Sequence, residues 1–209
     1  MSFYFKILFF SILIPFLLSF DKRIMFYKKF SVLLLSVPLS SIFFIFWDVI
    51  FTYNKIWWFS KDYISNFNLI FLPIEEILFF FIIPFCCLFT YSILKKYSIS
   101  FFNSSNWNFI HLIFGILCFL ISVANTSRLY TFVCFFSLSI IMLNIGMFRY
   151  KIDFNIFYSH FILMLIPFTV VNGALTGSYF GQKVVWYNIY EILNIHYFTI
   201  PVEDVAYCL

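Results

Sequence analysis

The run LPIEEILFFFIIPFCCLFTY, residues 72–91, indicates the fold of the whole chain. It is a nearly unbroken apolar stretch, about as long as the ~20 residues that a helix needs to cross the hydrocarbon core of a bilayer. Pro73 suits the first position of a helix, and the adjoining acids Glu75 and Glu76 interact favourably with the positive end of the helix dipole. The run therefore predicts a transmembrane helix that begins with a pair of carboxyl groups.

This acidic motif occurs twice. Pro201-Val202-Glu203-Asp204 repeats Pro73-Ile74-Glu75-Glu76 at a distance of 128 residues. Only 11% of the residues are charged and Asp and Glu total 9, so the two motifs hold four of the nine acids. Ionisable groups at a membrane edge are energetically unfavourable, so they are candidates for functional residues. An ordinary helix start is the alternative for one copy, whereas the repetition favours a function.

The composition places the chain among membrane proteins. Hydrophobic residues make up 64% of the 209 and aromatic residues 26%, whereas a soluble domain has roughly 45–50% apolar residues. The net charge of +4 comes from basic residues in short turns between apolar runs, which suits membrane orientation better than nucleic-acid binding. The five cysteines lie in apolar stretches without metal-ligand spacing to a histidine, so no metal site is expected.

Apolar runs separated by polar turns predict an all-α integral membrane protein with about six complete transmembrane helices and a truncated seventh. The expected spans are Phe3–Phe20, Ser31–Tyr53, Phe71–Leu94, Phe109–Asn125, Leu129–Met147 and Phe154–Leu175, with a seventh from about Thr199 to Leu209. The first run lacks a small-residue cleavage site, so it is expected to be a retained span and not a signal peptide. The last run is about half as long as a crossing requires, so we expect a fragment or a chain that has lost its tail.

Lysine and arginine in the turns predict the orientation. The turns after the first, third and fifth spans hold eight basic residues, Arg149 among them, and the turns after the second, fourth and sixth hold four. The richer side is expected to be cytoplasmic. This places the N-terminus and both acidic motifs at the outer side of a multi-pass protein of the cell inner membrane.

The two halves of the chain are related to each other. Asp48 and Thr52 end the second predicted span, and Asn172 and Thr176 end the sixth with the same spacing, so each pair shares one helical face. Four spans separate the starts of the two acidic motifs, so both motifs run the same way through the membrane. We therefore expect two parallel three-helix repeats with a shared site at their interface. The expected divisions are a first repeat at 1–98, a linking span at 99–128 and an incomplete second repeat at 129–209.

Paired carboxyls in an apolar setting are suited to proton transfer, because two adjoining acids titrate as a coupled pair. Asp48 and Asn172 are candidates to hold these carboxyls in position, although Asp48 also fits a hydrated interface residue. His196 is a candidate to assist proton transfer, and a plain loop histidine is its alternative. No Gly-x-Gly-x-x-Gly pattern exists among the 5 glycines, which excludes a Rossmann-type flavin or nicotinamide site.

These residues resemble the membrane-integral lycopene cyclase domain, the non-flavin type found as paired small subunits in some bacteria and fused to phytoene synthase in fungi. In the first half the resemblance is carried by Phe46-Trp47-Asp48, Thr52, Trp57, Phe59, Tyr63 and the run at 72–91. In the second half it is carried by Val171-Asn172-Gly173, Leu175-Thr176-Gly177, Val185-Trp186-Tyr187-Asn188 and Thr199-Ile200-Pro201-Val202-Glu203-Asp204. The chain is similar to two tandem domains of this family over nearly its whole length. It departs from the family where Lys55 and Trp58 stand in a loop that usually has glycines, and in its incomplete last helix.

The resemblance implies carotenoid biosynthesis by a lycopene β-cyclase-like isomerase that needs no cofactor. An acid protonates carbon 2 of a linear lycopene end group, the 5,6-double bond attacks the cation at carbon 1, and a base removes the proton on carbon 6, which gives a β-ionone ring. The implied catalytic residues are Glu75, Glu76, Glu203, Asp204 and Asp48. The implied substrate-binding or cation-stabilising residues are Asn172, Trp47, Trp57, Trp58, Trp186 and His196.

The expected partners are the bilayer and lycopene, a molecule about as long as the bilayer is thick. A homo-oligomer and other enzymes of the carotenoid pathway are open alternatives as protein partners, and no nucleic acid is expected. Two other functions fit the same pattern. One is a related end-group hydratase, distinguished by access of water to the cation; the other is a non-catalytic proton or cation transporter built on parallel repeats. The position of the acids at helix mouths and not at mid-membrane counts against the transporter.

Overall fold

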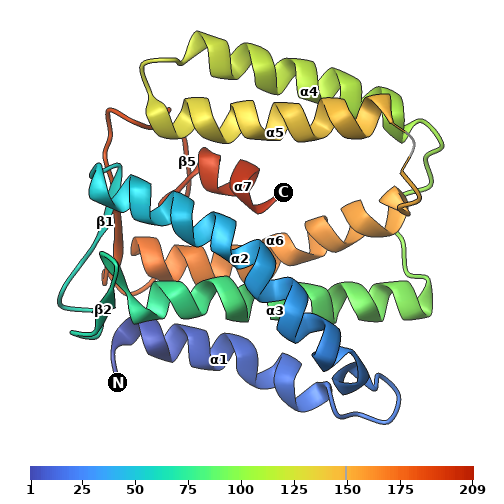
Figure 1. Cartoon of the computed structure of the whole chain (residues 1–209), viewed down its shortest axis with the longest axis horizontal. Coiled ribbons are helices and arrows are strands. Elements are labelled where there is room, and N and C mark those ends of the chain that lie inside the picture. The colour runs from blue at the N-terminus through green and yellow to red at the C-terminus, as the bar shows by residue number, and fades with distance from the viewer. Residues whose placement is uncertain (149) are drawn as a thin grey trace.

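A computed structural model of the chain describes residues 1–148 and 150–209. Within these residues the chain forms seven α-helices, and a short 3₁₀ helix at Phe26–Lys29 leads into the second (Figure 1). The α-helices are α1 Phe3–Leu18, α2 Phe30–Tyr53, α3 Ile74–Tyr97, α4 Trp107–Ala124, α5 Leu129–Met147, α6 Phe154–Thr176 and α7 Val202–Cys208. The all-α class predicted from the sequence is therefore confirmed.

Five of these helices, α2 to α6, are long and apolar enough to cross a membrane. Helix α1 has 16 residues and α7 has 7, so α7 rises only about 10 Å at 1.5 Å per residue. Large apolar side chains on the outer faces of α2 and α4, such as Leu34, Leu35 and Ile116, are exposed. Apolar surface this extensive fits contact with lipid and not with water. The chain is a membrane protein.

Short strands, which the sequence analysis did not predict, connect the helices at one end of the bundle. Strand β1 (Trp57–Phe59) pairs with β4 (Val185–Tyr187), β2 (Asn68–Leu69) with β3 (Leu72–Pro73), and β5 (His196–Tyr197) with β6 (Ile200–Pro201), all antiparallel. The β1–β4 pair joins the two halves of the chain, and its central partners are Trp58 and Trp186. These two residues are 128 positions apart, the same distance as the two acidic motifs. The two paired strands therefore occupy equivalent positions in the two halves of the chain.

The helices form two groups with α7 between them. In Figure 1, α4 and α5 lie together along one side, α1 and α3 lie along the opposite side, and α7 lies between α5 and α6. Helices α4 and α5 approach closely at glycines: a Cβ at Gly115 would lie 2.8 Å from Leu143 Cγ, and one at Gly146 would lie 2.8 Å from Leu112 Cγ. This close approach makes α4 and α5 one packing unit, and α4 contributes no residue to the main buried cluster of the described residues.

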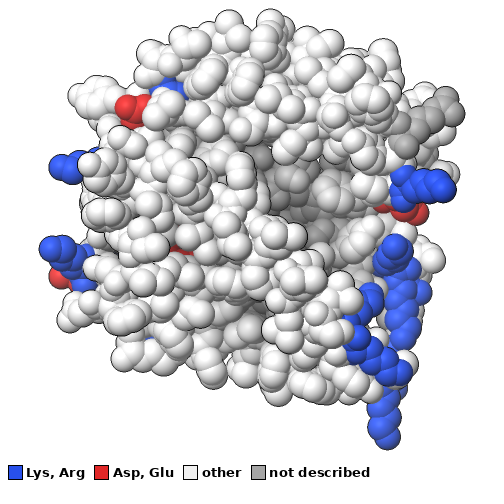
Figure 2. All heavy atoms as spheres, viewed as in Figure 1, with Lys and Arg blue, Asp and Glu red and all other residues white. Residues whose placement is uncertain are grey.

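Basic side chains gather at the end of the bundle opposite the strands. Figure 2 shows a group of Lys and Arg side chains at the end where the α1–α2 connection and the end of α3 lie. They include Lys22, Arg23, Lys95 and Lys96, all exposed. Arg149, which the orientation count included, lies outside the described residues. Since this charge distribution follows the positive-inside rule, it supports the predicted orientation, which itself stays a prediction.

Candidate active site

The predicted acids meet at the strand-bearing end of the bundle, where α3 and α7 begin and α2 ends (Figure 1). Pro73 and Pro201 are the last residues before α3 and α7, and both have extended backbone angles. Each proline also pairs in a short hairpin, Pro73 with Asn68 and Pro201 with His196. The hairpins thus set where each helix starts and place two carboxyls in its first turn.

The first acid of each motif is tied to the preceding loop. Glu75 is fully buried and accepts hydrogen bonds from the Ser2 hydroxyl, from Ser65 N (2.7 Å) and from the Ser65 hydroxyl (2.9 Å). Glu203, also fully buried, accepts from Thr131 Oγ1 (2.5 Å) and from Leu193 N (2.7 Å). In both motifs the backbone donor precedes the acid by ten residues. These first acids anchor the loops to the helix starts.

The second acid of the first motif lies beside Asp48. Glu76 is half-buried and its Oε2 accepts a hydrogen bond from the Tyr4 hydroxyl at 2.7 Å. Asp48 is buried, and its Oδ1 accepts from Trp57 Nε1 at 2.6 Å and from Thr52 Oγ1 at 3.2 Å. Its Oδ2 has no N–H or O–H donor among the described residues, but the Glu76 carboxyl lies within hydrogen-bonding reach of Asp48. Two carboxyls can bond in this way only when one of them carries a proton.

The second acid of the second motif is held differently. Asp204 is buried and accepts one hydrogen bond on each oxygen, from Tyr130 and from Tyr187, both at 2.7 Å. The two phenol rings stack with their centroids 6.2 Å apart. Burial, and next the carboxylate of Asp204, raise the pKa of the Tyr187 phenol well above its usual value. Tyr187 therefore stays a neutral donor to Asp204 at any physiological pH.

Aromatic rings surround these second acids. The Trp57 ring lies 4.9 Å from Phe51 and 5.1 Å from Tyr130, centroid to centroid. Trp47 lies 5.3 Å from Phe51 and 5.8 Å from Tyr207, and its indole N–H has no partner among the described residues. The cluster is drawn from α2, α5, α7 and the β1–β4 pair, so both halves of the chain contribute to it.

The remaining predicted residues lie at the margins. Trp58 and Trp186 face outward and are exposed, with the Lys183 ammonium 4.2 Å from the Trp186 ring. His196 is exposed on β5. The Asn172 amide donates to Phe168 O in the preceding turn at 3.3 Å, and no hydrogen bond joins it to the acids in the described part of the chain.

The tyrosines that donate to the acids were not predicted from the sequence. Tyr4 and Tyr130 begin α1 and α5, the first helices of the two halves, and each reaches an acid more than seventy residues away. Their similar places at the starts of corresponding helices are the one signal that could have identified them. No group of three or more His, Cys, Asp or Glu side chains among the described residues could hold a metal ion.

The comparisons with known proteins point to one family. A family model described as lycopene cyclase matches residues 1–94 and 127–209, which is more than half of the chain. The unmatched stretch between these segments contains α4. No curated protein and no solved structure matches the chain.

Proposed function

This chain belongs to the lycopene cyclase family, and we propose that it closes the linear end groups of lycopene into β-ionone rings by proton transfer between its own side chains. Membership of the family supports a role in carotenoid biosynthesis. The observation that carries the finer proposal is the pairing of Asp48 with Glu76 beside Asp204, inside one aromatic cluster.

The Asp48–Glu76 pair is the proposed acid. A proton shared by two carboxyls is held in place and can be delivered from a defined position. Trp57 and Thr52 donate to Asp48, which stabilises the negative charge left when the proton departs. Glu76 is the half-buried member of the pair, so it is the one proposed to reach carbon 2 of the end group.

Asp204 is the proposed base. Both of its oxygens accept phenol hydrogen bonds, the pattern of an ionised carboxylate that can receive a proton. It is close enough to Glu76 for the two carboxyl groups to influence each other electrostatically. Acid and base thus come from different halves of the chain, so one reaction centre would need both repeats at 1–98 and 129–209. One proton enters the substrate and one leaves it, so the reaction needs no redox cofactor.

The aromatic cluster is proposed to stabilise the carbocation formed between these two steps. A cation over an aromatic face gains about 0.5–2 kcal/mol, and Trp57 and Trp47 carry the largest rings in the cluster. The apolar surroundings also limit water, which would otherwise convert the cation into an alcohol. Water access is therefore the difference between this proposal and an end-group hydratase.

The proposed setting is a multi-pass protein of the inner membrane with the reaction centre near the outer face. Lycopene dissolves in the bilayer, so it can reach the centre from the lipid without crossing water. The second acids lie in the first turns of α3 and α7, where an end group arriving from the hydrocarbon core would meet them.

Expression in a lycopene-producing host tests the function. A cyclised carotene of the same mass as lycopene is expected in the pigment extract, and membranes washed free of flavin and nicotinamide should retain the activity. A product heavier by one water would favour the hydratase. Unchanged lycopene from well-inserted protein would refute both enzyme functions and favour the transporter.

A further inference from the structure

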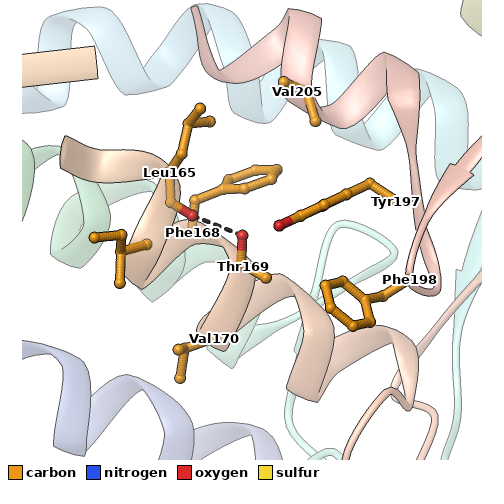
Figure 3. A pocket seen from close by; sticks show the side chains of 8 residues that line it. Leu165, Phe168, Thr169, Val170, Tyr197, Phe198 and Val205 are labelled. Carbon is orange, nitrogen blue, oxygen red and sulfur yellow. Dashed lines mark hydrogen bonds between the residues drawn. The ribbon is translucent and has the colours of Figure 1, made fainter. Parts of the chain in front are cut away.

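A groove of about 600 Å³ lies between α6, α7 and the hairpin of β5 and β6. Its walls are almost wholly apolar: Leu165, Phe168 and Val170 come from α6, Val205 from α7, and Tyr197 and Phe198 from the hairpin. Figure 3 shows the rings of Phe168 and Tyr197 on opposite sides of the space. A groove of this size is within the usual range for a small-molecule site.

The groove adjoins the proposed reaction centre. Val205, which lines the groove, follows the buried Asp204 directly in the first turn of α7. On α6, Thr169 lies in the groove and Asn172 is three residues further on, on the same helical face. A molecule lying in the groove would therefore have one end near Asp204.

The corresponding helices in the first half of the chain, α2 and α3, are bonded to each other. There the Ser41 hydroxyl on α2 donates to Phe80 O on α3 at 2.6 Å, and the Phe44 and Phe80 rings stack. By the spacing that relates Asp48 to Asn172, the counterpart of Ser41 is Leu165, which has no hydroxyl and lines the groove. The two halves therefore differ here, because Ser41 bonds α2 to α3 whereas Leu165 lines the groove.

We infer that this groove binds the polyene chain of the substrate while one end group reacts. The ligand class is a long, uncharged, rod-shaped hydrocarbon, since the walls offer apolar surface and only the hydroxyls of Thr169 and Tyr197. Helix α6 has 23 residues and is about 34 Å long, comparable to the thickness of the hydrocarbon core of about 30 Å. The groove takes up residues 165–170 of this helix, so it would hold the part of the polyene next to the reacting end group while the rest lies along α6 in the lipid. This inference rests on the proposed function for the identity of the ligand.

Ile166 and Ile42 provide a matched pair for the test. They occupy corresponding positions on α6 and α2 and are each 66% exposed, but only Ile166 lines the groove. In a Glu76→Gln background, which leaves bound lycopene unreacted, the pigment that co-purifies with the protein is measured by its visible absorption. We expect Ile166→Trp to lower bound lycopene at least tenfold, and Ile42→Trp to leave it nearly unchanged.

Equal lycopene content in the two tryptophan variants would overturn the inference, and so would a Glu76→Gln protein that binds no lycopene. If lycopene binding depends on Ile166 but the wild-type protein releases lycopene unchanged, the result would contradict the proposed cyclase activity and still support lycopene binding in the groove. The two failures are therefore separate.

Discussion

Glu76→Gln should abolish most of the activity and leave the fold intact. The glutamine amide can keep both contacts of the glutamate: its carbonyl oxygen can accept from Tyr4, and its N–H can donate to the carboxyl of Asp48. What it lacks is a proton that can be transferred to carbon. We expect turnover to fall about 10²–10⁴-fold, the usual effect of losing a positioned acid, which corresponds to about 3–5 kcal/mol of activation free energy. The free energy of unfolding should change by less than about 1 kcal/mol.

The matched control is Glu75→Ala in the same motif. Glu75 accepts three hydrogen bonds, each worth about 1 kcal/mol. The free energy of unfolding of this variant should therefore be lower by about 3 kcal/mol. The protein that remains folded should retain activity per molecule within about tenfold. The assay compares cyclised product per mole of folded protein, with thermal unfolding in detergent as the stability readout. Normal specific activity of Glu76→Gln, together with lower abundance, would refute the assignment of Glu76 as the acid.

Three further predictions concern other parts of the molecule. Trp57→Phe keeps a ring but removes the N–H donor to Asp48 at 2.6 Å, a loss of about 1–2 kcal/mol; turnover should fall about tenfold, and an unchanged rate would argue against a role for this contact. A reporter fused after Lys96 should read cytoplasmic and one within 60–68 should read external, and the reverse pattern would move the site to the cytoplasmic side. Gly146→Ala should lower the free energy of unfolding by about 1–3 kcal/mol through overpacking, because its Cβ would lie 2.8 Å from a side-chain atom of α4. The activity per folded molecule should stay unchanged, and a loss of that activity without a loss of stability would contradict the prediction.

The positions of most helices could be predicted from the sequence. The predicted fifth span, Leu129–Met147, has the same bounds in the structure, and the second and sixth differ by one residue at one end. The third helix was predicted from Phe71 but begins at Ile74, because Leu72 and Pro73 pair in a hairpin. Two-residue strands carry no periodic signal, so neither this hairpin nor the β1–β4 pair could be predicted.

Candidate residues far from the acidic motifs were harder to judge. The sequence related Asp48 to Asn172 by spacing, but the structure brings only Asp48 to a carboxyl of a motif, while the Asn172 amide bonds within its own helix. His196 is near Pro201 in the chain, yet strand pairing leaves it exposed. Tyr4, Tyr130 and Tyr187 reach the acids across the bundle or through a strand. Closeness in the chain does not predict such contacts, which depend on how separate helices pack.

The sequence by itself determined that the chain lies in a membrane, that it repeats, and that each half presents two adjacent acids at a helix start. These properties follow from composition, run length and local backbone preferences. Only the tertiary structure decided which acid of each pair faces the aromatic cluster that both halves build. Adjacent residues on a helix point about 100° apart, so Glu75 and Glu203 face their loops while Glu76 and Asp204 face the aromatic cluster. That choice depends on the rotation of α3 and α7 about their axes, which is set by packing against α1, α2 and α5 and not by the order of the residues.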